Sequence, residues 1–139
     1  MKLLMTPLLF ITIFVHAQTG VMGKWTTIHD ETGEVMAEVE VFERNGSVYG
    51  RILKISSLKN PDPVCNECPE DDARFGKKVI GMEIIKDLKK SGNYYGEGSI
   101  LDPKGGRIYR CKIWMDGKNL IVRGYWGPFY RTQTWIKSS

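Results

Sequence analysis

The sequence contains few of the residues on which catalytic and metal-binding sites depend. It has two histidines and three cysteines in 139 residues, and it lacks the Gly-x-Ser-x-Gly motif of many hydrolases. The acidic residues between positions 67 and 72 lack the alternating ligands and the glycine of an EF-hand loop. The net charge is only +4, and the basic residues are spread along the chain rather than concentrated for nucleic acid. We therefore predict no catalytic residue, metal site, cofactor or nucleic-acid partner.

Long apolar runs are scarce too, and the one at the amino terminus has the layout of a secretory signal peptide. Lys2 precedes an apolar core at residues 8–15, and a small-residue cleavage site follows between Ala17 and Gln18. No stop-transfer pattern comes after it, which disfavours the alternative of an uncleaved membrane anchor. We predict that residues 1–17 are removed and that the protein is periplasmic or secreted, with no membrane span left. Residues 18–139 then form a single domain with 19 basic and 16 acidic side chains.

Glycines and aromatic residues in the rest of the chain are typical of a β-rich fold. The sequence has 15 glycines, four tryptophans and six tyrosines, which favour strands joined by tight turns. Val39 and Val41 alternate with Glu38 and Glu40, which is the period of a half-buried strand. The same reasoning predicts strands at residues 23–28, 35–42, 48–55, 94–101, 107–115, 120–126 and 131–137.

The region between residues 56 and 90 interrupts this pattern. Prolines at positions 61, 63 and 69 exclude a central strand and predict a long loop. Farther on, Ile80, Ile84 and Leu88 recur at helical spacing, although Gly81 weakens a helix. We expect a short strand near residues 79–81 and one or two helical turns near residues 83–90.

The turns between the predicted strands indicate the architecture. Asn45-Gly46 and Asp116-Gly117 are strong hairpin signals because their residues tolerate positive φ. Sequential hairpins favour an antiparallel up-and-down β-barrel of about eight strands, which leaves no exposed sheet edge. A barrel of about this size holds either packed side chains or one small ligand.

The three cysteines divide into a close pair and a single residue. Cys65 and Cys68 lie in the long loop, and an exported protein meets oxidising conditions, so a structural disulfide is favoured. The alternatives are a redox dithiol and half of a metal site, but acidic neighbours such as Glu67 would raise a thiol pKa rather than activate it. Cys111 falls on the apolar face of its strand and is expected to be a buried, inert thiol. His29, the one histidine outside the predicted signal, is expected in a surface turn.

Short fragments occur in one order along the predicted mature chain. They are Gly23-Lys24-Trp25, Asn45-Gly46, Val48-Tyr49-Gly50-Arg51-Ile52, Cys65-Asn66-Glu67-Cys68, Ile80-Gly81, Ile100-Leu101-Asp102-Pro103, Gly106, Tyr109-Arg110-Cys111, Val122-Arg123-Gly124-Tyr125 and Arg131-Thr132-Gln133-Thr134-Trp135. In this order and spacing they resemble the exported bacterial family catalogued as domain of unknown function 2147. The resemblance covers essentially the whole predicted mature chain.

The resemblance implies a small exported barrel of the lipocalin-like, calycin type. The Cys65–Cys68 disulfide favoured above would clip the long loop of this barrel. In calycins a tryptophan near the closed end packs beneath an arginine from the last strand. Trp25 is the matching tryptophan, and Arg131 is the expected arginine, with Arg123 as the second choice. A guanidinium can stack on an indole ring in this way. The resemblance brings no catalytic residues.

Aromatic and arginine side chains on the predicted strands are the candidates for ligand contacts. They are Trp25, Tyr49, Arg51, Tyr109, Arg123, Tyr125 and Trp135. Arginines directed into an apolar cavity would favour a carboxylate, a fatty acid or another anion. We therefore expect binding of a small apolar or anionic ligand, with a purely structural role as the alternative for Trp25, Arg131 and Trp135.

Two other functions are compatible with the sequence. One is a filled barrel that acts as a non-enzymatic interaction module and contacts components of the cell envelope. The other is a hydrolase or isomerase acting inside the cavity, which a barrel fold alone never demonstrates. The sequence gives no oligomeric state.

Overall fold

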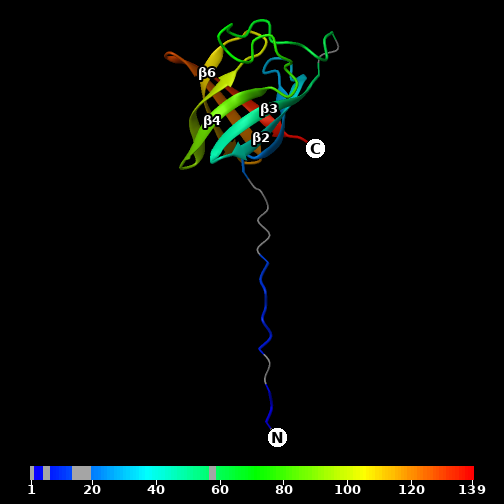
Figure 1. The fold of residues 1–139 in the computed structure, drawn as a ribbon, viewed down its shortest axis with the longest axis vertical. Coiled ribbons are helices and arrows are strands. Elements are labelled where there is room, and N and C mark those ends of the chain that lie inside the picture. Colours follow the sequence, from blue (N-terminus) through cyan, green and yellow to red (C-terminus); the bar gives the residue numbers. More distant parts are fainter. Residues whose placement is uncertain (1, 5–6, 14–19, 57–58) are drawn as a thin grey trace.

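An antiparallel β-barrel accounts for most of the chain (Figure 1). The computed structural model describes residues 2–4, 7–13, 20–56 and 59–139, and within these ranges eight strands close into one barrel. Each strand pairs with its neighbours in sequence, and β8 returns to pair with β1. The predicted all-β, up-and-down architecture is thus confirmed. The strands are β1 (Gly23–Ile28), β2 (Val35–Arg44), β3 (Ser47–Ile55), β4 (Glu83–Ser91), β5 (Tyr94–Leu101), β6 (Ile108–Asp116), β7 (Asn119–Trp126) and β8 (Phe129–Lys137).

The alternation of apolar and charged residues decides which face of each strand lies inside. In β2, Val39 and Val41 are buried, whereas Glu40 lies on the outer face and accepts hydrogen bonds from Arg51 of β3. The turn between these strands has φ angles of 52° at Asn45 and 81° at Gly46, which the hairpin signal predicted. Local turn chemistry and strand period therefore act together to set the register.

The segment that contains β4 corrects one expectation. Residues 79–81 lie in a turn rather than a strand, and the predicted helical turns near 83–90 are a β-strand. The helix-like spacing of apolar residues in this segment is caused by a β-bulge at Asp87. At the bulge φ is 60°, and β4 holds one extra residue opposite β3. Because of the bulge, Ile85 and Leu88 are both fully buried although they are three positions apart. A bulged strand thus has the apolar spacing of a helix.

The two ends of the barrel differ. At one end the strands are joined by two-residue turns at positions 45–46, 92–93 and 117–118, and residues 20–22 lead into β1. The interior of this closed half is filled by side chains from many strands, among them Trp25, Val41, Val48, Leu88, Ile113 and Leu120. At the other end the connections are longer except for the two-residue turn at 127–128, and the loop between β3 and β4 lies there (Figure 1). Open space inside the barrel is consequently expected only near the loops.

The long loop is held in place by covalent and ionic contacts. The predicted disulfide joins Cys65 and Cys68, and both cysteines are buried. The buried guanidinium of Arg74 donates to both carboxylate oxygens of Asp72 at 2.9 Å and to the backbone oxygen of Glu83 at 2.9 Å. The hydrogen bonds from Arg74 lower the pKa of Asp72 to about 2. The loop is therefore fastened to the start of β4.

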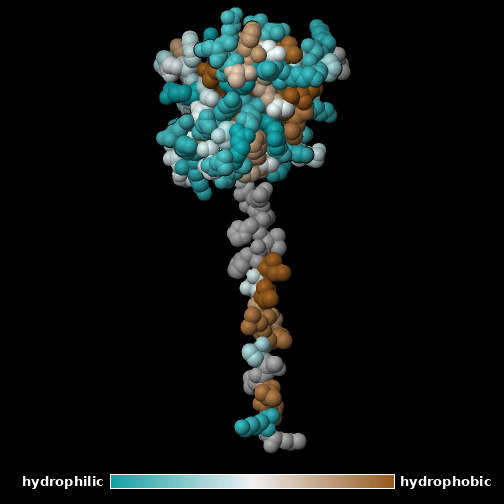
Figure 2. Space-filling model, viewed as in Figure 1, coloured by the Kyte–Doolittle hydropathy of each residue, from teal (hydrophilic) through white to brown (hydrophobic). Residues whose placement is uncertain are grey.

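The amino-terminal stretch is separate from the barrel. Residues 2–4 and 7–13 form neither helix nor strand, and the apolar side chains of 8–11 are exposed, as the brown run in Figure 2 shows. The predicted cleavage site between Ala17 and Gln18 lies outside the described residues, so the signal peptide stays a prediction. Among the residues that the structure describes, no helix has the length and apolar character needed to cross a membrane.

Candidate ligand cavity

A cavity of about 760 Å³ opens at the end of the barrel where the long loop lies. Inward-facing residues of several strands form its wall, and residues of the loops at 29–34, 60–67 and 102–104 surround its mouth. Cavities that bind small molecules commonly measure about 300–1,000 Å³. The barrel therefore has room for one small ligand in addition to its packed closed half.

The wall of the cavity is mainly apolar. Val39, Ile52 and Val122 contribute buried aliphatic side chains from three different strands. Trp135 of β8 is also buried there, and its Nε1 donates to Oε1 of Gln133 at 3.0 Å. Because the polar atom of the indole is already satisfied, its ring is available as an apolar surface.

Polar side chains lie at the mouth and carry charges of both signs. Arg131 of β8 donates from Nη2 to Oδ2 of Asp30 at 2.9 Å. His29 accepts hydrogen bonds at Nδ1 from the backbone nitrogens of Glu31 and Thr32, so this turn fixes its ring. Further charged residues in the lining are Glu34, Glu67, Asp102 and Lys104. The mouth thus offers polar contacts above an apolar interior.

The structure brings two of the predicted ligand contacts to this cavity. Tyr109 of β6 and Trp135 of β8 both belong to its lining. Trp25 lies instead in the packed closed half, where it is fully buried and donates from Nε1 to the backbone oxygen of Val21 at 2.9 Å. Its position favours a structural role, which is the alternative expected from the sequence for Trp25.

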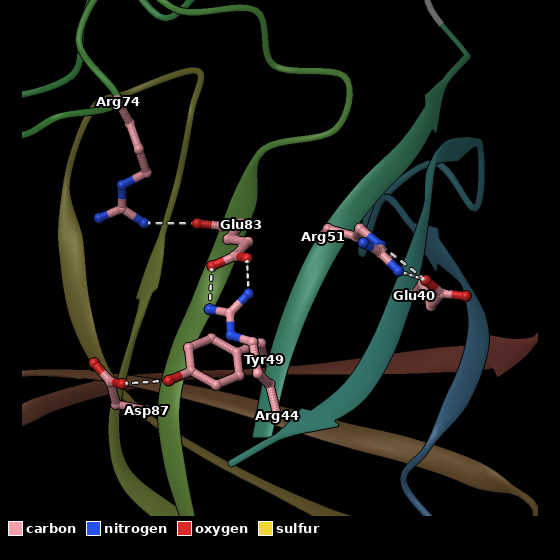
Figure 3. Close-up of polar contacts among 7 residues, drawn as sticks. All are labelled: Glu40, Arg44, Tyr49, Arg51, Arg74, Glu83 and Asp87. Carbon is pink, nitrogen blue, oxygen red and sulfur yellow. Dashed lines mark hydrogen bonds and ion pairs between the residues drawn. The ribbon is translucent and has the colours of Figure 1, made fainter. Parts of the chain in front are cut away.

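Tyr49 and Arg51 do share one face of β3, but it is the outer face (Figure 3). The hydroxyl of Tyr49 donates to Oδ1 of Asp87 at 2.8 Å, and this hydrogen bond raises the pKa of Tyr49. Arg51 forms an exposed ion pair with Glu40 of β2. Neither residue contributes to the cavity lining.

Arg123 and Tyr125 lie on the outer face of β7. Arg123 donates to the hydroxyl of Thr132 at 2.8 Å, and its guanidinium lies over the ring of Tyr130. Tyr125 contacts Tyr130 with a ring-centroid distance of 6.0 Å. Arg51 and Arg123 are therefore directed away from the interior, and Arg131 is the arginine of the lining.

The expected closure of the barrel by Arg131 and Trp25 needs a correction. Strand β8 runs from the open end to the closed end, and Trp25 pairs with Lys137, six residues after Arg131. The ammonium of Lys137 lies 5.2 Å from the centroid of the Trp25 ring. The last strand thus covers the tryptophan with a lysine, and the second choice, Arg123, stacks on Trp114 and Tyr130 instead.

The remaining cysteine matches its expected environment. Cys111 is a free thiol in the buried core of β6, and burial raises its pKa to about 12. Among the residues described, no group of three or more histidine, cysteine or acidic side chains could hold a metal ion.

The sequence did not single out several residues that form the cavity. Val122 and Ile52 were recognisable as strand residues, but nothing local distinguishes an apolar residue beside a cavity from one in a packed core. Gln133 and Ala37 have inward positions on β8 and β2. Strand alternation predicts that Gln133 and Ala37 share the face of the apolar residues on their strands. Only the closed barrel shows that they line the cavity rather than the packed half.

This chain is similar to a known protein family in sequence and to a known protein in structure. The sequence model of a family described as "Uncharacterized protein conserved in bacteria (DUF2147)" matches residues 23–137. The protein HP1028 from the human pathogen Helicobacter pylori, which belongs to the lipocalin family, is similar in structure with a TM-score of 0.70. The two are 22% identical, and the match covers 85% of this chain and 82% of that chain. This likeness shows a common fold.

A curated human protein is also similar over part of its length. "Immunoglobulin superfamily member 2" from Homo sapiens is 27% identical over 114 residues, which are 79% of this chain and 10% of the human protein. The chain thus spans about a tenth of that relative. Immunoglobulin domains are two-sheet sandwiches, whereas all strands here belong to one closed barrel within the described residues. This similarity carries no functional argument.

Proposed function

The chain belongs to the bacterial DUF2147 family of uncharacterised proteins, and from that premise we propose that its lipocalin-like barrel binds one small, mainly apolar molecule. The observation that supports this function is the cavity of about 760 Å³ with its apolar wall and its polar mouth. Such a combination provides burial for most of a ligand and a few polar groups to orient it. The cavity also argues against a filled barrel that acts only as an interaction module.

The ligand's outer end is proposed to be anionic. Arg131 lies at the mouth, and its side chain is 69% exposed although it pairs with Asp30. Lys104 adds a second cation to the lining. A carboxylate could take two parallel hydrogen bonds from the guanidinium, which gives orientation as well as attraction. Fatty acids and similar amphiphiles have this combination of an apolar body and an anionic end.

Export is the remaining part of the proposal. The layout of residues 1–17 supports a cleaved signal peptide, which would place the barrel in the periplasm or outside the cell. The Cys65–Cys68 disulfide supports the same location, because disulfides persist in oxidising compartments.

Native mass spectrometry of the full-length gene product, recovered from the exported fraction, tests these points together. We expect a chain that begins at Gln18 and carries an added small mass, which leaves on denaturation and is then identified from an organic extract. The Ala37→Trp variant places an indole in the cavity wall and should carry no added mass. A matched control, Glu38→Trp, places the same ring on the outer face and should retain the ligand. If the same mass adheres to both variants, it does not lie in the cavity.

A further inference from the structure

The hairpin between β7 and β8 has aromatic residues on both of its faces at its tip. Tyr125, Trp126, Phe129 and Tyr130 flank the turn at 127–128, and we call these four residues the aromatic tip. Trp126 is 52% exposed, Phe129 is 67% exposed and Tyr130 is 63% exposed. The turn stands at the open end of the barrel, the same end as the mouth of the cavity. Large exposed aromatics gathered in one place indicate an interaction surface.

Four cations lie beside this tip, on β6, on β7 and in the turn before β6, and each contacts an aromatic ring. They are Arg107, Arg110, Lys112 and Arg123, which we call the cationic face. The guanidinium of Arg107 is 4.4 Å from the centroid of the Trp126 ring, and that of Arg123 is 4.5 Å from the centroid of the Tyr130 ring. The rings thus hold the cations in place beside the tip.

Within the described ranges, the cationic face has no carboxylate partners. Among the described residues, none of its four members takes part in an ion pair, although Arg131 at the neighbouring rim pairs with Asp30. The outer face of β2, β3 and β4 is built differently, because each of its arginines pairs with an acid (Figure 3). There, Arg44 pairs with Glu83 and lowers the pKa of that carboxyl. The arginines of β2 and β3 are therefore paired with acids, whereas those of the cationic face remain available, within the part of the chain that the structure describes.

These features together suit the surface of an anionic lipid bilayer. Tryptophan, tyrosine and phenylalanine favour the boundary between headgroups and acyl chains, and nearby cations are attracted to anionic headgroups. A second copy of the chain fits poorly, since a two-fold contact would bring two cationic faces together. Nucleic acid would use the cations but would gain little from an aromatic tip at the end of a hairpin.

We propose that the aromatic tip and the cationic face dock the barrel on an anionic phospholipid bilayer, with the mouth of the cavity facing the membrane. The tip enters the headgroup region, and the four cations lie against the lipid phosphates. This surface uses residues outside the cavity lining, so its test does not depend on whether the cavity holds a ligand. An apolar ligand could then pass between the membrane and the cavity with little exposure to water.

Vesicle flotation tests the proposal with the exported protein, whose amino terminus is first defined by mass. Vesicles of phosphatidylcholine alone are compared with vesicles that contain roughly 30% phosphatidylglycerol. We expect binding to the anionic vesicles, weak binding to the neutral ones, and a loss of affinity as salt is raised above about 0.1 M. Equal binding to both vesicle types, or no binding to either, would refute the proposal.

Matched variants locate the contact. Trp126→Ala with Phe129→Ala should lower the affinity about tenfold or more, because the inserted apolar surface is lost. Arg107→Gln with Arg110→Gln should lower it about fivefold per cation. The control Lys90→Gln with Lys118→Gln removes the same charge near the closed end and should leave the affinity within about twofold. Loss in the control alone, or no loss in the two test variants, overturns the assignment of this surface.

Tryptophan fluorescence gives a second readout that a misfolded variant cannot imitate. Trp126 is the most exposed of the four tryptophans, so vesicles should shift its emission to shorter wavelength. The Trp126→Phe variant keeps an aromatic side chain and should retain binding while it loses most of the shift. Binding of a soluble polyanion such as polyphosphate, with no shift on vesicles, would indicate a polyanion site and contradict membrane docking.

Discussion

At the scale of single residues, burial decides the chemistry of Cys111. Its thiol lies in the core of β6 beside aliphatic side chains, and removal from water disfavours the thiolate. A pKa of about 12 keeps the group protonated at any physiological pH. Cys111 is therefore a packing residue, as expected for a small apolar side chain.

This environment predicts slow alkylation. Folded protein treated with iodoacetamide at about pH 8 should remain unmodified at Cys111, because the reactive thiolate is scarce and inaccessible. The same reagent in denaturant should add one group per chain, since the other two cysteines are joined. Mass spectrometry measures both. Rapid modification of the folded protein would show that β6 opens readily.

A second residue-scale prediction concerns Arg131. If the ligand's anionic end meets this guanidinium, Arg131→Gln should weaken binding of a long-chain fatty acid about tenfold. Binding of the alcohol with the same chain should change little, because it carries no charge. Arg51→Gln is the matched control on the outer face and should affect neither ligand. Competition against a fluorescent apolar probe measures the affinity of wild type and both variants for each ligand. Equal losses for the acid and the alcohol would exclude recognition of the ligand's charge by Arg131.

At the scale of elements, the long loop depends on one buried ion pair. Arg74 is buried and joins Asp72 to the backbone of Glu83, so the loop and β4 are held together. The pKa of Asp72 is lowered to about 2, which means that folding favours its ionised form. The stability from this pair is present above pH 4 and is lost as the pH falls toward 2.

Asp72→Asn should therefore reduce the free energy of unfolding by about 2 kcal/mol at neutral pH. It should also flatten the fall of Tm between about pH 4 and pH 2, because the variant has no carboxyl to protonate. Glu40→Gln breaks the exposed pair with Arg51 and should change stability by less than about 1 kcal/mol. Thermal unfolding across this pH range compares the two. If the Tm of Asp72→Asn falls between pH 4 and pH 2 as steeply as that of wild type, other groups control the loss of stability in acid.

The turn at 102–107 predicts a further effect on the mouth. Gly106 has a φ of 76°. A Cβ at this position would overlap the backbone oxygen of Glu67 in the long loop. Gly106→Ala should therefore destabilise the fold by roughly 3 kcal/mol and increase protease cleavage of the loop. Gly117→Ala is the control, because its φ is also positive but the space around it is open. It should cost about 1 kcal/mol from backbone strain alone. Equal effects would exclude a contact between the two loops.

The elements also show how far sequence patterns predict this fold. Most strands and the Asn45-Gly46 hairpin follow from short-range alternation and turn preference, which are local properties. Strand β4 does not, because its inward residues Ile85 and Leu88 are spaced by the bulge at Asp87. A bulge depends on the partner strand, and a single sequence contains little trace of it.

At the scale of the whole molecule, the candidate site depends on closure of the barrel. The sequence predicted Tyr109 and Trp135 in a cavity, and both line it. It also placed Tyr49 with Arg51, and Arg123 with Tyr125, on common faces, but alternation alone cannot say which face is inside. Residues such as Arg131 and Asp30 meet at the mouth although they are 101 positions apart. Their pairing follows from the return of β8 to β1, which no local pattern contains.

The molecule thus combines a packed closed half, an apolar cavity at the open end and the cationic face on its outside. The proposed function depends on binding of an apolar ligand in this cavity. Equilibrium titration with a fluorescent apolar probe tests it most directly, using wild type, Ala37→Trp and Glu38→Trp. We predict one saturable site in wild type and Glu38→Trp, and at least about tenfold weaker binding in Ala37→Trp, whose new ring occupies the cavity. Equal binding by all three proteins, or no saturable binding by wild type, would contradict the account.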